Sequence, residues 1–359
     1  MAMASPNYVQ ALHGHSPHVT EPENIMNSNL IRRASLCGCA ALLMILHAIA
    51  TPADNILTMV KDLSLPGRPT RWDYMAMDPV QHRLVIAHLG DSSVVIVSTL
   101  TGKVIGTVGD ISNVHGVLSV LETNRIYATA TGTNELAVID STTLKVISRV
   151  PTGRYPDGLA YAPEVKKIYV SDAHGNSETV IDARTHQRFA TIPLGGSVGN
   201  TQYDEITHHI FVNVQGRREL VEINPETDRI VQRVALPDAD GNHGLLIDAQ
   251  RRLAFIACEG NDQLLVLDLK TRTVNARFRV PGSPDVLAFD KKASVLYVAS
   301  ESGAIYLFKV GDNGVNPAGQ IVIGMNAHTV AVDPETQWLY LPLISPDGKN
   351  ILRVMRPIF

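Results

Sequence analysis

Residues 167–175 read KIYVSDAHG and residues 295–303 read VLYVASESG. Each stretch is a short apolar strand centred on an aromatic residue and followed by a Gly-bearing turn, and related stretches recur along the chain. The central residues are Val85, Tyr127, Tyr169, Phe211, Phe255, Tyr297 and Tyr340. Successive centres are 42, 42, 42, 44, 42 and 43 residues apart. Because self-similarity at this period is typical of propeller blades, the sequence predicts seven of them.

Each repeat has the same order of four segments. The first is a short apolar strand such as GLAYA at 158–162, which a polar turn separates from the strong central strand. A third strand such as ELAVID at 135–140 follows, and a Thr-rich turn leads to a fourth such as KVISRV at 145–150. Short runs of β-branched and aliphatic residues between turn formers are typical of strands. The expected fold class is therefore all-β, with four strands per blade.

The two ends of the repeat array complete each other. The seventh repeat has only three strands and stops at residues 351–355, ILRVM. Residues 56–63, ILTMVKDL, resemble the fourth strands of the other repeats. Pairing these two segments would close the ring and remove an edge that could recruit other chains. We therefore expect residues 51–359 to form one seven-bladed β-propeller, with blade 7 closed by the N-terminal strand.

The repeat resembles a known family. IYVSDAHGN at 168–176 and LYVASESG at 296–303 match the signature of the YVTN repeat, and PDGLAYAP at 156–163 matches the strand before it. The chain is thus similar to the YVTN-type (YncE-like) family of seven-bladed β-propellers over residues 55–359. This resemblance implies a fold rather than a function, because members use the scaffold for varied roles.

The N-terminal region has the features of an export signal. Arg32 and Arg33 precede an apolar run from Leu36 to Ile49, and residues 48–50 read AIA, like a signal cleavage site. The run is short for a membrane-spanning helix, which needs about 20 apolar residues, although an uncleaved anchor is the alternative. We expect residues 1–50 to be an N-terminal extension and signal peptide, with translation starting at Met1 or Met26. The protein is then periplasmic or secreted, without a membrane span after cleavage.

Charge and cysteine content exclude several classes of protein. The formal net charge is −4 over 359 residues, and removal of residues 1–50 leaves it unchanged. Such a chain has no overall positive field for nucleic acid or an anionic membrane. Cys258 is the one cysteine after residue 50, so no disulfide framework is expected. We expect a monomer stabilised by packing.

A fixed offset from the repeat centres predicts a ring of polar residues. The first strand of each blade lines the central channel, and it begins about twelve residues before each centre. The residues at that offset are Asp73, His115, Asp157, Gly199, His243, Asp285 and His328. Six of the seven are Asp or His, the side chains that bind metals and transfer protons. We call these seven positions the ring, and we expect them at one mouth of the channel.

Three interpretations of the ring remain open at this point. The first is one divalent metal ion (zinc, iron or manganese) held by His115, His243 and His328. Such a site would be similar to the axial metal sites of propeller lyases and lactonases. Asp73, Asp157 and Asp285 would then orient the imidazoles or bind a ligand. The second is general acid–base chemistry by neighbouring His–Asp pairs on an organic ligand. The third is a wet rim, whose polar side chains bond only to each other and to nearby backbone N–H groups.

The loops that enter the first strands add further candidates on the same face. Arg71 and Arg154 could clamp a carboxylate or phosphate by paired hydrogen bonds. Trp72 and Tyr155 could stack on a ligand ring. Alternatively, Trp72 packs against blade 7.

The sequence therefore favours an extracytoplasmic binding scaffold that holds a small molecule, a divalent metal or a protein loop at the channel mouth. A metal-dependent lyase or lactonase using the same residues is one alternative, and a protein or cell-wall interaction module is another. The chain contains no Walker, G-x-S-x-G or HExxH motif that would point to a particular reaction.

Overall fold

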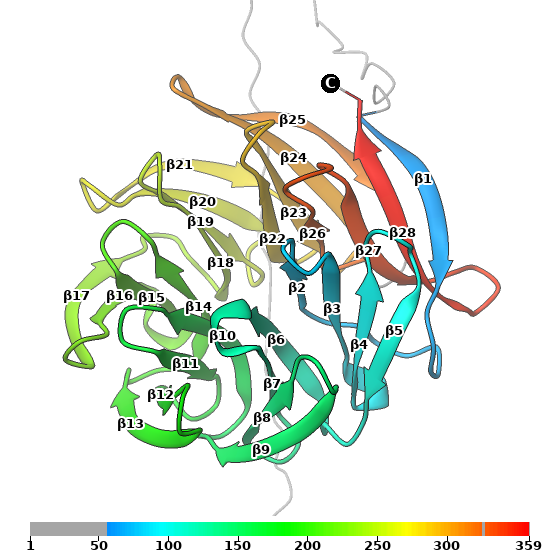
Figure 1. Ribbon diagram of the computed structural model, residues 1–359. Coiled ribbons are helices and arrows are strands. Elements are labelled where there is room, and N and C mark those ends of the chain that lie inside the picture. The colour runs from blue at the N-terminus through cyan, green and yellow to red at the C-terminus, as the bar shows by residue number, and fades with distance from the viewer. Residues whose placement is uncertain (1–55, 325–326, 359) are drawn as a thin grey trace, which may run out of the picture. The chain divides into compact units, whose positions relative to one another are not determined.

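The computed structural model describes residues 56–324 and 327–358, which form seven four-stranded antiparallel sheets arranged around a central channel (Figure 1). This confirms the predicted seven-bladed β-propeller. The predicted signal peptide and its cleavage after Ala50 concern residues outside the described ones.

The strands of each blade follow one another in the chain, from the channel outwards. Blade 1 consists of β2 Met75–Asp78, β3 Arg83–His88, β4 Ser93–Ser98 and β5 Val104–Val108. Blade 2 consists of β6 Val114–Val120, β7 Arg125–Ala130, β8 Glu135–Asp140 and β9 Lys145–Pro151. Blade 3 consists of β10 Pro156–Ala162, β11 Lys167–Asp172, β12 Ser177–Asp182 and β13 Gln187–Pro193. Blade 4 consists of β14 Val198–Asp204, β15 His209–Val214, β16 Glu219–Asn224 and β17 Arg229–Ala235.

The second half of the ring repeats this order. Blade 5 consists of β18 Asn242–Asp248, β19 Leu253–Cys258, β20 Gln263–Asp268 and β21 Thr273–Arg279. Blade 6 consists of β22 Pro284–Asp290, β23 Val295–Ser300, β24 Ala304–Gly311 and β25 Gly314–Val322. Blade 7 consists of β26 Ala331–Val332, β27 Leu339–Ile344, β28 Asn350–Pro357 and β1 Leu57–Ser64. The helical segments of the described chain are the 3₁₀ turns Leu89–Asp91, Leu121–Thr123 and Gln215–Arg217, and none is long and apolar enough to cross a membrane.

Burial explains why the second strand of each blade is apolar at nearly every residue. Both faces of such a strand are covered by the neighbouring blades, and β23 (VLYVAS) is buried along its whole length. The outermost strands have one wet face, so β21 (TVNARFR) alternates between exposed and half-buried residues. The aromatic repeat centres are among the largest fully buried side chains: Tyr127, Tyr169, Phe211, Phe255, Tyr297 and Tyr340.

The N-terminal strand closes the ring as predicted. β1 pairs antiparallel with β28, with Met59 opposite Met355, and the two run side by side in Figure 1. Arg353 of β28 donates to both carboxylate oxygens of Asp62 in β1, at 2.9 and 2.8 Å. Leu57 is buried in the core shared by blades 6 and 7.

Trp72 contributes to the closure. Its side chain is fully buried in the core that blades 1 and 7 share, together with Tyr340 and Leu352. Its ring stacks on His88 with centroids 3.7 Å apart, and Nε1 donates to Asn350 Oδ1 at 3.3 Å. Of the two expectations for Trp72, packing against blade 7 is the one observed. A fully buried indole is not available to stack on a ligand.

Candidate ligand site at the channel mouth

The ring positions start the innermost strands, and most of them meet at one cavity. This cavity, which we call the mouth, has a volume of about 400 Å³. The ring residues that line it are Asp73, His115, Asp157, His243 and Asp285. His328 is fully buried, with Nδ1 4.0 Å from Glu301 Oε2. Gly199 leaves no opening, because a Cβ there would lie 2.7 Å from the carbonyl oxygen of His243.

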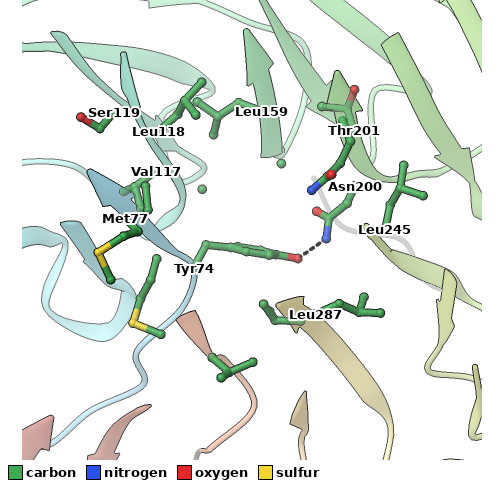
Figure 2. Close-up of a pocket in the computed structure, with 17 residues that line it drawn as sticks. Tyr74, Met77, Val117, Leu118, Ser119, Leu159, Asn200, Thr201, Leu245 and Leu287 are labelled. Carbon is green, nitrogen blue, oxygen red and sulfur yellow. Dashed lines mark hydrogen bonds between the residues drawn. The ribbon is translucent and has the colours of Figure 1, made fainter. Parts of the chain in front are cut away.

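Tyr74 separates the mouth from the channel below it. Its phenol extends across the channel towards Asn200 of blade 4, whose Nδ2 donates to the hydroxyl at 2.7 Å (Figure 2). The same hydroxyl lies 3.1 Å from Nε2 of His243 in blade 5. Below Tyr74 the channel has a cavity of about 300 Å³, whose walls combine apolar side chains such as Leu159 and Leu287 with polar ones such as Thr201. The mouth is therefore a polar chamber with a tyrosine floor.

Three other blades have glycine at the position equivalent to Tyr74. Gly116, Gly158 and Gly244 follow the ring residues of blades 2, 3 and 5. A Cβ on Gly116 would lie 2.2 Å from the carbonyl oxygen of Asp157, and one on Gly244 would lie 2.0 Å from that of Asp285. The neighbouring innermost strands approach too closely for a side chain there. Tyr74 and Asn200 are thus larger exceptions that meet in the channel.

Three buried carboxylates and one imidazole dominate the electrostatics of the mouth. Asp73, Asp157 and Asp285 are 2%, 4% and 7% exposed. Nε2 of His243 lies 3.7 Å from Asp157 Oδ2 and 3.8 Å from Asp285 Oδ1. Burial raises the pKa of Asp73 well above its usual range, and the carboxylates of Asp285 and Asp157 raise it further. The pKa of Asp285 is also raised, again chiefly by burial.

His243 responds to the same carboxylates in the opposite sense. Burial alone lowers the pKa of His243, but Asp157 and Asp285 outweigh burial, so that the net shift is upwards. Both ring nitrogens have partners, since Gln215 Nε2 lies 2.7 Å from Nδ1. For the Tyr74 phenol, burial and the two carboxylates raise the pKa well above its usual range, so it is neutral at physiological pH.

Arg71 is engaged by a carboxylate of its own. Its guanidinium donates to both oxygens of Glu301, at 3.2 and 2.7 Å. Nε lies 3.6 Å from Asp73 Oδ2. Arg71 lines the mouth as predicted, but it is already paired within the protein, so it is not a free clamp for an anionic ligand.

An aromatic wall forms one side of the mouth. The ring of Tyr155 lies between those of His115 and His174, with centroid separations of 5.2 and 4.3 Å. The Nδ1 of His115 contacts the carbonyl oxygen of Asn113 at 2.8 Å, which can only accept, so Nδ1 carries a proton. The hydroxyl of Tyr155 lies 3.1 Å from His115 Nε2. Tyr155 thus lines the mouth as predicted. Arg154 does not line it and instead donates to the carbonyl oxygen of His174.

The predicted set of three histidine ligands is not gathered around one point. Within the described residues, the group of three potential ligands whose atoms all lie within 4.8 Å of one another is Asp285, Glu301 and His328. His115 and His243 lie outside that group, because each projects from a different blade and bonds to its own neighbours. Metal binding itself stays a prediction.

Several residues of the mouth were not among the predicted ones. Gln215, Glu259 and Glu301 lie in the turns after the second strands of blades 4, 5 and 6, and His174 lies in that of blade 3. Each of the first three comes four residues after its repeat centre, so a second fixed offset in the sequence could have found them.

Comparisons with known proteins identify the fold. Hydrazine synthase of Kuenenia stuttgartiensis is similar with a TM-score of 0.70 and 15% identity, over 80% of this chain and 96% of that chain. U3-55K has a TM-score of 0.70 and 12% identity over 83% and 98%. The WD40 repeats of RRP9 have a TM-score of 0.70 and 12% identity over 86% and 99%. At these identities the likeness shows a shared β-propeller fold alone. No family model matches the chain, and no curated protein sequence matches it.

Proposed function

We propose that this protein is an extracytoplasmic binding scaffold that holds a small ligand at the mouth. The observation that carries the proposal is convergence: charged and aromatic side chains from five blades, together with Gln215 of blade 4, line one cavity of about 400 Å³. A cavity of that size suits a small organic molecule. A rim that is merely wet has no need of three buried carboxylates, which are costly to desolvate. The extracytoplasmic location rests on the N-terminal sequence, and intact-mass measurement of exported protein beginning at Thr51 would test it.

A divalent metal at the axis is the second candidate, and a metal-dependent lyase or lactonase would need it. Asp285, Glu301 and His328 favour it, because their donor atoms lie close enough to share an ion. Against it stands Arg71, whose guanidinium occupies both oxygens of Glu301 and would repel a cation bound beside it. Elemental analysis of the purified protein separates the two candidates: zinc, iron or manganese near one per chain would favour the metal.

The small-ligand proposal is tested by a thermal-shift screen of metabolites that covers anions, neutral molecules, organic cations and metal ions. A ligand that binds only the folded state at a hundred times its Kd stabilises it by about 2.7 kcal/mol, which raises Tm by several degrees. We expect such a shift for the wild type and for the control variant Glu226→Gln, but not for Asp157→Asn. Glu226 is an exposed residue in a turn of blade 4. If every stabilising compound acts equally on Asp157→Asn, the mouth is not the site.

A further inference from the structure

The residues that line the mouth carry an excess of negative groups. Five of them are acidic: Asp73, Asp157, Asp285, Glu259 and Glu301. Arg71 is the one permanently cationic side chain among the residues that line this cavity, and Glu301 neutralises it. The titratable or charged groups that face the three aspartates are Tyr74, Tyr155, His115, His174, His243, His328, Glu259, Glu301 and Arg71. Even with Asp73 neutral and His243 protonated, the four remaining acidic side chains outnumber the two cations, Arg71 and His243.

One oxygen of each of two carboxylates also lacks a hydrogen-bond donor. Oδ1 of Asp157 and Oδ1 of Asp285 are buried without a hydrogen-bond partner in the described part of the chain. His243 Nε2 is too far from either carboxylate for a hydrogen bond, at 3.7 and 3.8 Å. A buried carboxylate oxygen without a donor is unfavourable, because it has lost its hydrogen bonds to water without replacing them. Both residues line the mouth, so a cation that enters this cavity lies beside their side chains.

We infer that the ligand of the mouth is a small organic ammonium ion, bound by Asp157 and Asp285 through its N–H groups. This inference rests on the proposed function and names the class of ligand. A primary ammonium supplies three donors and one positive charge, which suit two carboxylates that each have an oxygen without a donor. The rings of Tyr155 and His115, tilted by 58° to each other, offer apolar surface for the methylene groups, and a tyrosine face attracts a cation within about 6 Å.

The other ligand classes match these residues less well. A carboxylate or phosphate would enter beside five acidic side chains, with its one potential clamp, Arg71, already paired. A zinc ion requires oxygen or nitrogen ligands at about 2.0–2.2 Å, and the set that could supply them includes Glu301, which Arg71 holds. An ammonium ion needs only hydrogen-bond distances of about 2.7–2.9 Å.

The test is isothermal titration calorimetry of the full chain with butylamine and putrescine. Succinate serves as the anionic probe of matched length, and zinc chloride tests the metal alone. We expect one amine per chain and a more than tenfold loss of affinity in Asp157→Asn and in Asp285→Asn. Glu226→Gln is the matched control and should bind like the wild type. Because Asn keeps the shape of Asp, unchanged unfolding midpoints would show that these variants are folded.

Repeating the titration in two buffers of different ionisation enthalpy shows whether binding releases or takes up protons. A bound cation favours the deprotonated form of every acid and imidazole at the mouth, so an amine should release protons, whereas an anion should take them up. Succinate or zinc could bind with an affinity that falls in Asp157→Asn while neither amine binds. The mouth would then still be a ligand site, but the ammonium inference would be wrong. Amine binding that is equal in all variants would place the amine elsewhere and also overturn the inference. If no probe binds and the wider metabolite screen is negative, the proposed function itself fails.

Discussion

The backbone of Tyr155 lies in the left-handed region, with φ of 61°. The equivalent positions of three other blades also have positive φ, and there the residues are Asn113, Gly241 and Ser283. Asn and Gly tolerate this conformation, whereas a residue with a bulky side chain pays about 1–2 kcal/mol for it. Tyr155 thus strains the backbone of the loop, but in the mouth its ring packs between those of two histidines. Strain that persists at a cavity favours a binding role.

Replacing Tyr155 should therefore separate binding from stability. In Tyr155→Asn, relief of the backbone strain offsets the lost hydrogen bond to His115, and the free energy of unfolding should change by less than about 1 kcal/mol. Affinity for the amine should fall at least severalfold. Urea denaturation and calorimetry measure the two quantities. Asn113→Tyr, which imposes the same strain in blade 2, should be destabilising. A loss of about 3 kcal/mol in Tyr155→Asn, typical of a core aromatic residue, would contradict this account.

The sequence predicted several of the residues that line the mouth, but not the partners to which they bond. The constant offset from the repeat centres correctly placed Asp73, His115 and Asp157 at one cavity, because each blade starts its innermost strand at the same height. Which partners they bond depends on distances between blades. The sequence pattern does not contain these distances, and so the pairing of Arg71 with Glu301 was missed.

Among the strands, β12 carries an acidic residue in an unexpected place. Glu178 is fully buried, its Oε1 accepts from Ser171 at 2.7 Å, and its Oε2 is buried without a hydrogen-bond partner. Burial raises the pKa of Glu178 well above its usual range, and the hydrogen bond from Ser171 offsets only part of that rise. A raised folded-state pKa means that the native protein binds a proton more tightly than the unfolded chain does. Stability from this group is therefore present at low pH and lost as pH rises.

Glu178→Gln should remove that pH dependence. The amide oxygen can still accept from Ser171, and the side chain stays neutral at every pH. At pH 4, below the usual glutamate pKa of about 4.3, the variant and the wild type should be similarly stable. At pH 8 the variant should be more stable by about 1 kcal/mol or more, the cost of an unsatisfied buried polar group. Urea midpoints across this range measure the difference, and equal pH slopes for both proteins would refute it.

β1 carries the closure of the ring. Deleting residues 51–64 removes seven paired residues, the buried Leu57 and the Asp62–Arg353 ion pair, and it exposes β28 as an edge. At roughly 0.5 kcal/mol per pair, the loss should be roughly 3 kcal/mol or more, and the shortened protein should self-associate. Light scattering and thermal unfolding measure both effects. Deleting residues 51–55 alone is the control, and an unchanged, monomeric 51–64 deletion would rule out closure by β1.

For the molecule as a whole, the period of the sequence determined the blade count and the pairing of its ends. The seventh repeat lacks its fourth strand, and the segment that resembles a fourth strand lies before the first repeat. The ligand did not follow from the same pattern, because a repeat describes what the blades share. The floor and the aromatic wall of the mouth come from departures from the repeat: Tyr74 stands where three other blades have glycine, and Tyr155 where three other blades have Asn, Gly or Ser.

The most direct test of ligand binding at the mouth is NMR of the protein labelled with ¹³C at histidine Cε1, during titration with putrescine. His115, His174 and His243 line the mouth, whereas His82, His186 and His208 do not, so the protein contains its own controls. Single His→Gln variants assign the signals. We predict that the signals of the three mouth histidines shift with one common Kd while those of the control histidines stay in place. Unmoved mouth signals at putrescine concentrations that saturate the calorimetric binding would contradict the claim.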